Sequence, residues 1–189
     1  MVMKRGSNFM AKINAGMAGG FSMVEMLIVM TIATVLTGLA VPGFSAVIQN
    51  QRMSGTVGDF FAAINLTRSE AIHRGTRVDL APSGDGSDWA KGWTVFIDEN
   101  GNQRADPGEK VIFTHGPVAK GLIINAALTD SKVQYLAYNG FGRTRTNASS
   151  QSPQSGTFSF IQGEKVRKIK INFLGRPRVC NPEVDGSTC

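Results

Sequence analysis

The hydrophobic residues of this chain first form one unbroken apolar run. Between Met26 and Ile48 no side chain is charged, and Met, Leu, Ile, Val, Ala and Phe dominate. About 20 such residues, each adding about 1.5 Å along a helix, are enough to cross a bilayer core of about 30 Å. The run therefore predicts an apolar helix that can span a membrane. Glu25 is the only charged residue near its start.

After this run, apolar positions recur at helical spacing as far as about residue 74. The stripe that this spacing predicts to be buried consists of Val57, Phe60, Phe61, Ile64 and Ile72. Glu70 and Arg74, four residues apart, are predicted to form an ion pair on the outer face. Gly75 is placed to end the helix as its C-cap. The pattern indicates an amphipathic helix that packs against a domain.

Beyond Gly75 the hydrophobic period changes to two, which is typical of strands. The segments predicted as strands are 77–81, 93–97, 111–115, 122–125, 133–138, 157–161, 166–173 and 178–180. In the segment 166–173, the residues predicted to face the core are Ile169, Ile171 and Phe173. Lys168 and Lys170 are predicted to face water. We therefore expect an α+β fold, in which a long N-terminal helix packs on an antiparallel β-sheet.

The charged residues are unevenly distributed along a chain of globular composition. Of the 189 residues 42% are apolar and 18% are charged, and the net charge is +6. Residues 132–189 hold nine Lys and Arg against three Asp and Glu. Such a basic patch attracts polyanions or anionic surfaces, and a solvated strand face is the simpler alternative. His73 and His115 stand in no catalytic motif, so we expect no enzyme, no metal and no cofactor.

A short motif precedes the apolar run. The block Gly19-Gly20-Phe21-Ser22-Met23-Val24-Glu25 resembles the type III signal of type IV pilins and type II secretion pseudopilins. The resemblance implies that a prepilin peptidase cuts after Gly20 and that the new amino terminus, Phe21, is methylated. It also implies that Glu25 pairs with the terminal amine of a neighbouring subunit. A helix capping box formed by Ser22 and Glu25 is an alternative role that is compatible with assembly.

Three further segments are similar to one branch of this family. Leu66-Thr67-Arg68-Ser69-Glu70-Ala71-Ile72, Gly92-Trp93-Thr94-Val95-Phe96-Ile97-Asp98 and Gly175-Arg176 resemble the minor-pilin branch that contains FimT, FimU and GspH. The resemblance implies a leader over residues 1–20, a transmembrane and polymerisation helix over 21–47, and a periplasmic pilin head over 48–189. The expected location is a single pass through the bacterial inner membrane, followed by the pilus fibre.

The expected role is that of a minor type IV pilin that joins other pilins through its N-terminal helix. One alternative is a type II secretion pseudopilin that does not bind DNA. Another is a membrane-anchored periplasmic binding module that never polymerises.

The block Gly175-Arg176-Pro177-Arg178 is the clearest candidate binding motif. Residues two apart in an extended segment project to the same side, so Arg176 and Arg178 are predicted to form a paired fork. Guanidinium groups suit phosphate contacts. The block is similar to the motif by which FimT proteins of transformable bacteria are thought to bind DNA. That resemblance implicates Arg176 and Arg178 in binding double-stranded DNA.

A second copy of the motif lies upstream at Gly142-Arg143-Thr144-Arg145. Arg143 and Arg145 extend the cationic surface if the fold brings the two copies together. The lysines and arginine expected to join them are Lys165, Arg167, Lys168 and Lys170. Contacts to phosphates are independent of base sequence and sensitive to salt. A solvated strand face remains the alternative for these residues.

Two other features concern cross-links and metals. Cys180 and Cys189 in an exported chain predict a disulfide, and a metal site formed by them would lack nearby His or further Cys ligands. Between residues 98 and 109, side-chain oxygens stand at positions 1, 3, 5, 9 and 12, as in an EF-hand loop. However, the sixth position is Gln103 rather than Gly, and strands flank the loop. A polar hairpin is therefore favoured over a calcium site.

Overall fold

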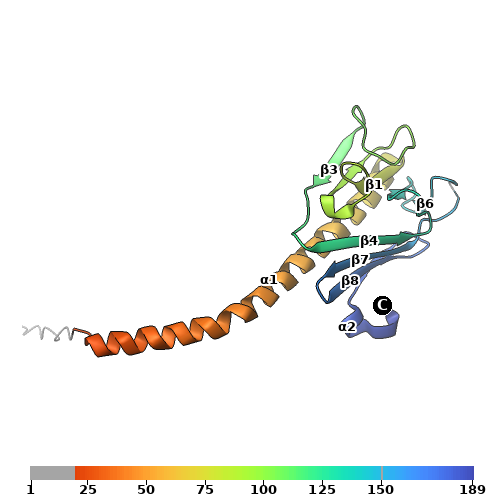
Figure 1. Ribbon diagram of the computed structural model, residues 1–189. Coiled ribbons are helices and arrows are strands. Elements are labelled where there is room, and N and C mark those ends of the chain that lie inside the picture. The colour runs from red at the N-terminus through yellow and green to blue at the C-terminus, as the bar shows by residue number, and fades with distance from the viewer. Residues whose placement is uncertain (1–19, 150) are drawn as a thin grey trace, which may run out of the picture. The chain divides into compact units, whose positions relative to one another are not determined.

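The computed structural model describes residues 20–149 and 151–189 (Figure 1). It divides into two compact units, the first ending at Phe44 and the second running from Ser45 to Cys189. The predicted leader, apart from Gly20, lies outside the described residues. Helix α1, Met23–Arg74, contributes its first part to the first unit and its second part to the second unit.

The first part of α1 presents large apolar side chains that the described residues of its own unit leave exposed. Met23, Leu27 and Met30, for example, are 82%, 60% and 63% exposed. The hydroxyls of Thr31 and Thr34 donate to the carbonyl oxygens four residues earlier, at 2.7 and 2.8 Å, so their polar atoms are satisfied within the helix. In the described part of the chain, no helix is long and apolar enough to span a membrane, and the span predicted over residues 21–47 is not confirmed.

The second part of α1 is amphipathic, as the spacing predicts. Its buried residues follow the helical repeat and are Met53, Thr56, Val57, Phe60, Ala63, Ile64, Thr67 and Ala71. The prediction that Ile72 is buried is wrong, because Ala71 occupies the inward position and leaves Ile72 51% exposed. The predicted ion pair forms, with Arg74 Nε 2.7 Å from Glu70 Oε2. Gly75, at φ +64°, follows the last helical residue.

The strands of the described chain form two antiparallel sheets. The first has the order β3-β2-β1-β5-β6, with bounds Val111–His115, Trp93–Phe96, Val78–Pro82, Leu136–Tyr138 and Thr144–Arg145. The second has the order β4-β7-β8-β9, with bounds Leu122–Leu128, Gly156–Gln162, Lys165–Ile171 and Pro177–Cys180. All pairings are antiparallel. Figure 1 shows β4, β7 and β8 lying side by side.

Each predicted strand corresponds to an observed one, and the α+β class is confirmed. The expectation of a single sheet is wrong, because the chain leaves the first sheet after β3 and begins the second with β4. The two-residue strand β6 was not predicted. Alternation along a strand identifies its two faces but does not identify its neighbours, so the sequence pattern did not distinguish one sheet from two.

Phe60 of α1 joins the helix to both sheets. Its ring lies 4.9 Å from that of Trp93 in β2, and 4.8 Å from that of Phe158 in β7. Trp89, in the short 3-10 helix η1 (Trp89–Lys91), adds an edge contact at 5.2 Å. Aromatic pairs at these separations contribute about 0.5–1.5 kcal/mol each beyond their buried area. This cluster holds α1 against both sheets, including β7, the strand that pairs with β8.

Candidate functional site

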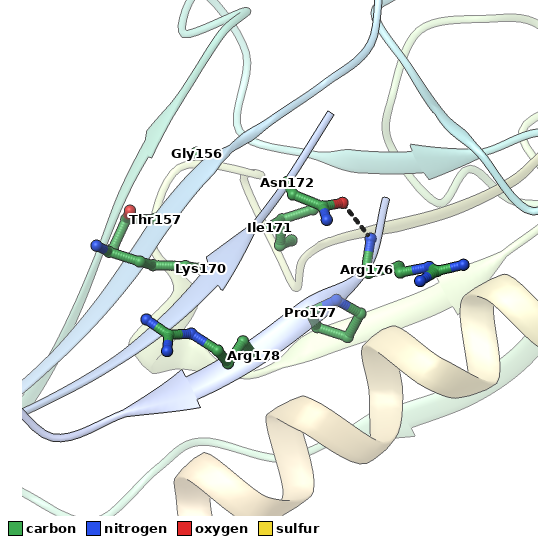
Figure 2. Close-up of a pocket in the computed structure, with 8 residues that line it drawn as sticks. All are labelled: Gly156, Thr157, Lys170, Ile171, Asn172, Arg176, Pro177 and Arg178. Carbon is green, nitrogen blue, oxygen red and sulfur yellow. Dashed lines mark hydrogen bonds between the residues drawn. The ribbon is translucent and has the colours of Figure 1, made fainter. Parts of the chain in front are cut away.

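A cationic groove of about 450 Å³ lies along the hairpin of β8 and β9 (Figure 2). It is lined by Gly156, Thr157, Lys170, Ile171, Asn172, Arg176, Pro177 and Arg178. None of these residues is acidic, and three carry a positive charge. Strand β9 is an edge of its sheet, so the groove lies on an accessible border. The groove is lined by Arg176, Pro177 and Arg178 of the block that the sequence indicated as the clearest candidate binding motif.

Both arginines of this motif line the groove, yet they do not form a paired fork. Arg176 and Arg178 are exposed, and Figure 2 shows their guanidinium groups pointing in opposite directions. Strand β9 begins only at Pro177, so Arg176 belongs to the preceding turn and the side-chain alternation of a strand does not extend to it. The predicted fork is therefore wrong in its geometry, although both charges reach one groove.

The C-terminal loop orients the cations at one end of the groove. Lys170 and Arg178 are cross-strand partners, and both approach the carbonyl oxygen of Thr188. Arg178 Nη2 donates to it at 2.5 Å and Lys170 Nζ at 3.5 Å. The disulfide between Cys180 and Cys189 is confirmed and closes the loop that contains Thr188. Because both sulfurs are bonded to each other, the alternative of a metal site at these cysteines is wrong.

The other end of β8 contributes less free charge than predicted. Lys165 Nζ and Arg167 Nη1 each lie 3.6 Å from a carboxylate oxygen of Glu183 in α2 (Pro182–Asp185). Arg167 also donates to Asn181 Oδ1 at 2.7 Å. Lys168 is half-buried on the face that the alternation predicts. The free cationic surface therefore lies toward the β8–β9 turn, where Phe173 is exposed rather than buried because β8 ends at Ile171.

The fold brings the two Gly-Arg motifs together. The hydroxyl of Tyr138, which is fully buried, donates to the carbonyl oxygen of Gly175 at 2.7 Å. A Cβ added to Gly175 would lie 3.0 Å from the backbone nitrogen of Thr144, which belongs to the upstream motif. Arg143 is exposed, while Arg145 is half-buried and donates to the Thr144 carbonyl at 2.8 Å. The upstream copy thus adjoins the C-terminal copy.

A second cavity, of about 220 Å³, lies beside the upstream motif. Its walls include Arg77, Tyr138, Asn139, Arg145 and Asn147. Arg77 is already paired with two acidic side chains, because its Nη2 lies 2.6 Å from Asp79 Oδ2 and 3.6 Å from Asp98 Oδ2, and its Nε donates to Asp79 Oδ1 at 2.7 Å. Burial raises the pKa of Asp79 to about 7, against the opposing effect of the Arg77 bonds. Arg145 is therefore the other basic residue that lines this cavity.

Sequence reasoning missed one basic residue near this surface. Arg68 lies on α1, and its Nε would be 3.2 Å from a Cβ added to Gly142. Its positive charge also opposes the rise in the pKa of Tyr138 that burial causes. No local pattern identifies Arg68, because more than 70 positions separate it from Gly142 in the sequence. Only the packing of α1 against the β5–β6 turn brings it there.

Two other predicted features, the processing motif at the start of α1 and loop 98–109, lie outside the groove. Gly20 and Phe21 precede α1 and Glu25 lies in its first turn, and all three are exposed. Their cleavage, methylation and pairing stay predictions. Loop 98–109 joins β2 to β3 as the predicted hairpin. Its oxygens bond within the loop, since Asp98 accepts from Gly101 N–H at 2.7 Å and Asp106 from the Asn100 amide at 2.8 Å.

Comparisons with known proteins find pilin-like proteins both by sequence and by fold. The family model for the type II transport protein GspH matches residues 56–175. The pilin-like protein PilA1 of Thermus thermophilus is 37% identical over 164 residues, covering 85% of this chain and 97% of that protein. The type IV minor pilin FimU of Pseudomonas aeruginosa has two similar crystal structures. One gives a TM-score of 0.56 at 18% identity over 71% of this chain and 92% of its own. The other gives 0.53 at 17% identity over 69% and 94%.

Proposed function

The chain belongs to the GspH family, whose minor pilins and pseudopilins have a structural role, and we propose that it is a minor type IV pilin that also binds DNA. As such a subunit it enters a pilus, or the complex that initiates one, together with other pilins. The observation that carries the fibre role is the uncovered apolar surface of the first part of α1. The observation that carries DNA binding is the groove around Arg176 and Arg178.

The fibre role follows from the physical cost of that apolar surface. Large apolar side chains at Met23, Leu27, Val35 and Phe44 are each more than half exposed, and a contiguous patch of this kind is not stable in water. Equivalent helices from neighbouring subunits provide a matching cover. A shallow groove lined by Met30, Ala33, Thr34, Thr37 and Gly38 offers small residues against which such a helix can pack closely.

Before assembly the same surface needs another apolar cover, which the proposal assigns to the bacterial inner membrane. A prepilin peptidase then releases the mature chain at Phe21. The test is the mass of the chain extracted from the producing cell. The expected mature chain begins at methylated Phe21, Gly20→Ala blocks this cleavage, and the neighbouring variant Gly19→Ala does not. A wild-type chain that retains residues 1–20 would remove the pilin proposal.

DNA binding follows from the charge and accessibility of the groove. Lys170, Arg176 and Arg178 line one groove, and no carboxylate lines it. Guanidinium and ammonium groups in such a groove contact phosphates, so binding is independent of base sequence and weakens as salt rises. The adjoining Arg143 and Arg145 lengthen the path that a DNA backbone can follow. Capture of duplex DNA for uptake is the biological use that we propose for this surface.

The test uses the full chain in a non-ionic detergent and a fluorescent duplex whose anisotropy reports binding. Arg176→Ala with Arg178→Ala should weaken binding about tenfold or more at low salt and lower the salt dependence by about two released counterions. The matched control is Lys165→Ala with Arg167→Ala, which removes the same charge from residues that Glu183 already occupies. An equal loss in both double variants would show that net charge alone attracts the DNA and would reject the groove.

The family model gives specific support to a second candidate, since its description is that of a type II transport protein. In that role the chain is a pseudopilin of the type II secretion machine and has no affinity for DNA. Deletion of its gene should then abolish secretion of exported enzymes while pili still form. Loss of pili with normal secretion would exclude this second candidate.

A further inference from the structure

Two turns in the C-terminal third share the pattern Asn-x-x-Gly-Arg and have the same hydrogen bonds. The first turn is Asn139-Gly140-Phe141-Gly142-Arg143, and the second turn is Asn172-Phe173-Leu174-Gly175-Arg176. In the first turn, the Asn139 N–H donates to the Arg143 carbonyl at 3.0 Å, and the Gly142 N–H donates to the Asn139 carbonyl at 2.8 Å. Asn139 Oδ1 accepts from the N–H groups of Phe141 and Arg143, both at 3.1 Å.

The second turn has every one of these bonds at the matching position. The Asn172 N–H donates to the Arg176 carbonyl at 3.2 Å, and the Gly175 N–H donates to the Asn172 carbonyl at 2.9 Å. Asn172 Oδ1 accepts from Leu174 N–H at 3.0 Å and from Arg176 N–H at 2.9 Å, the latter drawn in Figure 2. Both turns place glycine fourth, at φ +69° and +76°, where other residues are strained. Each backbone is therefore held in one shape.

Each turn presents an aromatic ring and a guanidinium to solvent. Phe141 is 88% exposed and Phe173 is 66% exposed, so neither ring contributes to the core. Arg143 and Arg176, at the last position of each turn, are also exposed. Rigid turns that hold rings outward beside arginines suit a ligand that has flat apolar faces and negative charges.

The two turns are physically joined and each borders a cavity. Tyr138, which ends the strand before the first turn, donates to the carbonyl of Gly175 in the second. Asn139 borders the cavity of about 220 Å³, and Asn172 borders the groove of about 450 Å³. The sequence carries no Asp or Glu over residues 131–163 or 165–182. Both turns thus belong to one surface that favours an anion.

We propose that the first and second turns together bind single-stranded nucleic acid, with Phe141 and Phe173 stacking on bases while Arg143 and Arg176 contact phosphates. This inference rests on the nucleic-acid binding proposed above and names the form of the strand that the surface selects. Bases in a duplex cover each other's faces, so an exposed phenyl ring finds a stacking partner only on a single strand or a frayed end. Stacking tolerates any base, because every base has a flat face.

The test compares a thymidine oligonucleotide of about 20 nucleotides with a duplex of the same length, because the oligonucleotide cannot pair with itself and offers free base faces. The protein is the full chain in non-ionic detergent. Phe141→Leu with Phe173→Leu keeps apolar bulk but removes the aromatic faces. We expect about tenfold or greater loss of affinity for the single strand and less than about twofold for the duplex. Phe141→Trp with Phe173→Trp should retain single-strand affinity. Val184→Ala, which truncates a side chain 79% exposed in α2, is the control.

The outcomes separate this inference from the function on which it rests. A wild-type chain that binds duplex but not the single strand overturns the inference and leaves DNA binding intact. Wild-type chain that binds neither removes both. If the Leu variants bind the single strand as well as wild type does, stacking is refuted. Impaired fibre formation by those same Leu variants would then assign the rings to contacts between subunits.

Discussion

Replacing Tyr138 by Phe should loosen the link between the two Gly-Arg motifs. The Tyr138 side chain is fully buried, and its hydroxyl donates to the Gly175 carbonyl at 2.7 Å. Burial raises the pKa of Tyr138, so the hydroxyl stays protonated and remains a donor throughout the neutral range. The substitution removes that oxygen and its proton and leaves the rest of the ring unchanged.

The expected cost follows from the carbonyl that loses its partner. Gly175 is buried, and an unsatisfied buried carbonyl costs about 1–3 kcal/mol. In a chain of this size each kcal/mol lowers the melting temperature by about 2–4 °C, so the expected decrease is about 2–12 °C. The phenyl ring should still fit the site, because Phe is smaller than Tyr by only the hydroxyl group.

The assay is thermal unfolding of the full chain in non-ionic detergent, followed by near-ultraviolet circular dichroism of the buried tryptophans. Tyr135→Phe is the matched control, since Tyr135 is equally buried and donates to Asp130 Oδ2 at 2.9 Å, away from the second turn. Both variants should melt earlier, but only Tyr138→Phe should speed hydrogen exchange at the Arg176 amide. Unchanged exchange at Arg176, together with an unchanged melting temperature, would refute the link.

Three further perturbations test other parts of the structure. Cys180→Ser opens the C-terminal loop and should lower the free energy of unfolding by about 2–3 kcal/mol, and a reductant should destabilise wild type by the same amount and leave the variant unchanged. Because the pKa of Asp79 is raised to about 7, the folded chain binds that proton more tightly than the unfolded chain does, so this residue's contribution to stability falls as pH rises from about 4 to 7. This pH-dependent loss of stability amounts to at most about 4 kcal/mol, and Asp79→Asn should abolish it. A stability difference between wild type and variant that does not vary with pH in melting experiments would contradict this prediction. Gly175→Ala places a Cβ 2.9 Å from the Tyr138 ring at a residue whose φ is +76°. The free energy of unfolding should fall by about 1–3 kcal/mol more than it does for the control Gly163→Ala, whose Cβ at φ +59° meets open space. Equal melting temperatures of the two variants would exclude the clash.

Local signals were sufficient for a large part of this chain. The helical repeat from Met53 to Ala71 and the alternation along β8 arise because one face of each element must be buried, and that requirement is visible within a few residues. The disulfide of Cys180 and Cys189 was predictable because only two cysteines exist and the loop between them is short. The motif around Gly20 and Glu25 is contiguous, so it needed no fold to be found.

The candidate site was predictable in its residues and only partly in its arrangement. Arg176 and Arg178 were found because they stand two apart, but one belongs to a turn and the other to a strand, and their guanidinium groups diverge for that reason. The asparagines of the two turns were missed. Their equal spacing before Gly-Arg was the signal that could have revealed them.

By itself the sequence determined the elements, the cross-link and the basic character of the C-terminal third, because each depends on neighbours along the chain. Only the tertiary structure decided that the strands divide between two sheets and that Arg68 reaches Gly142 in the first turn. It also decided that Glu183 neutralises the cations at one end of β8, and that Tyr138 ties one Gly-Arg motif to the other. These contacts join residues far apart in sequence, so they depend on how whole elements pack, which no local pattern encodes.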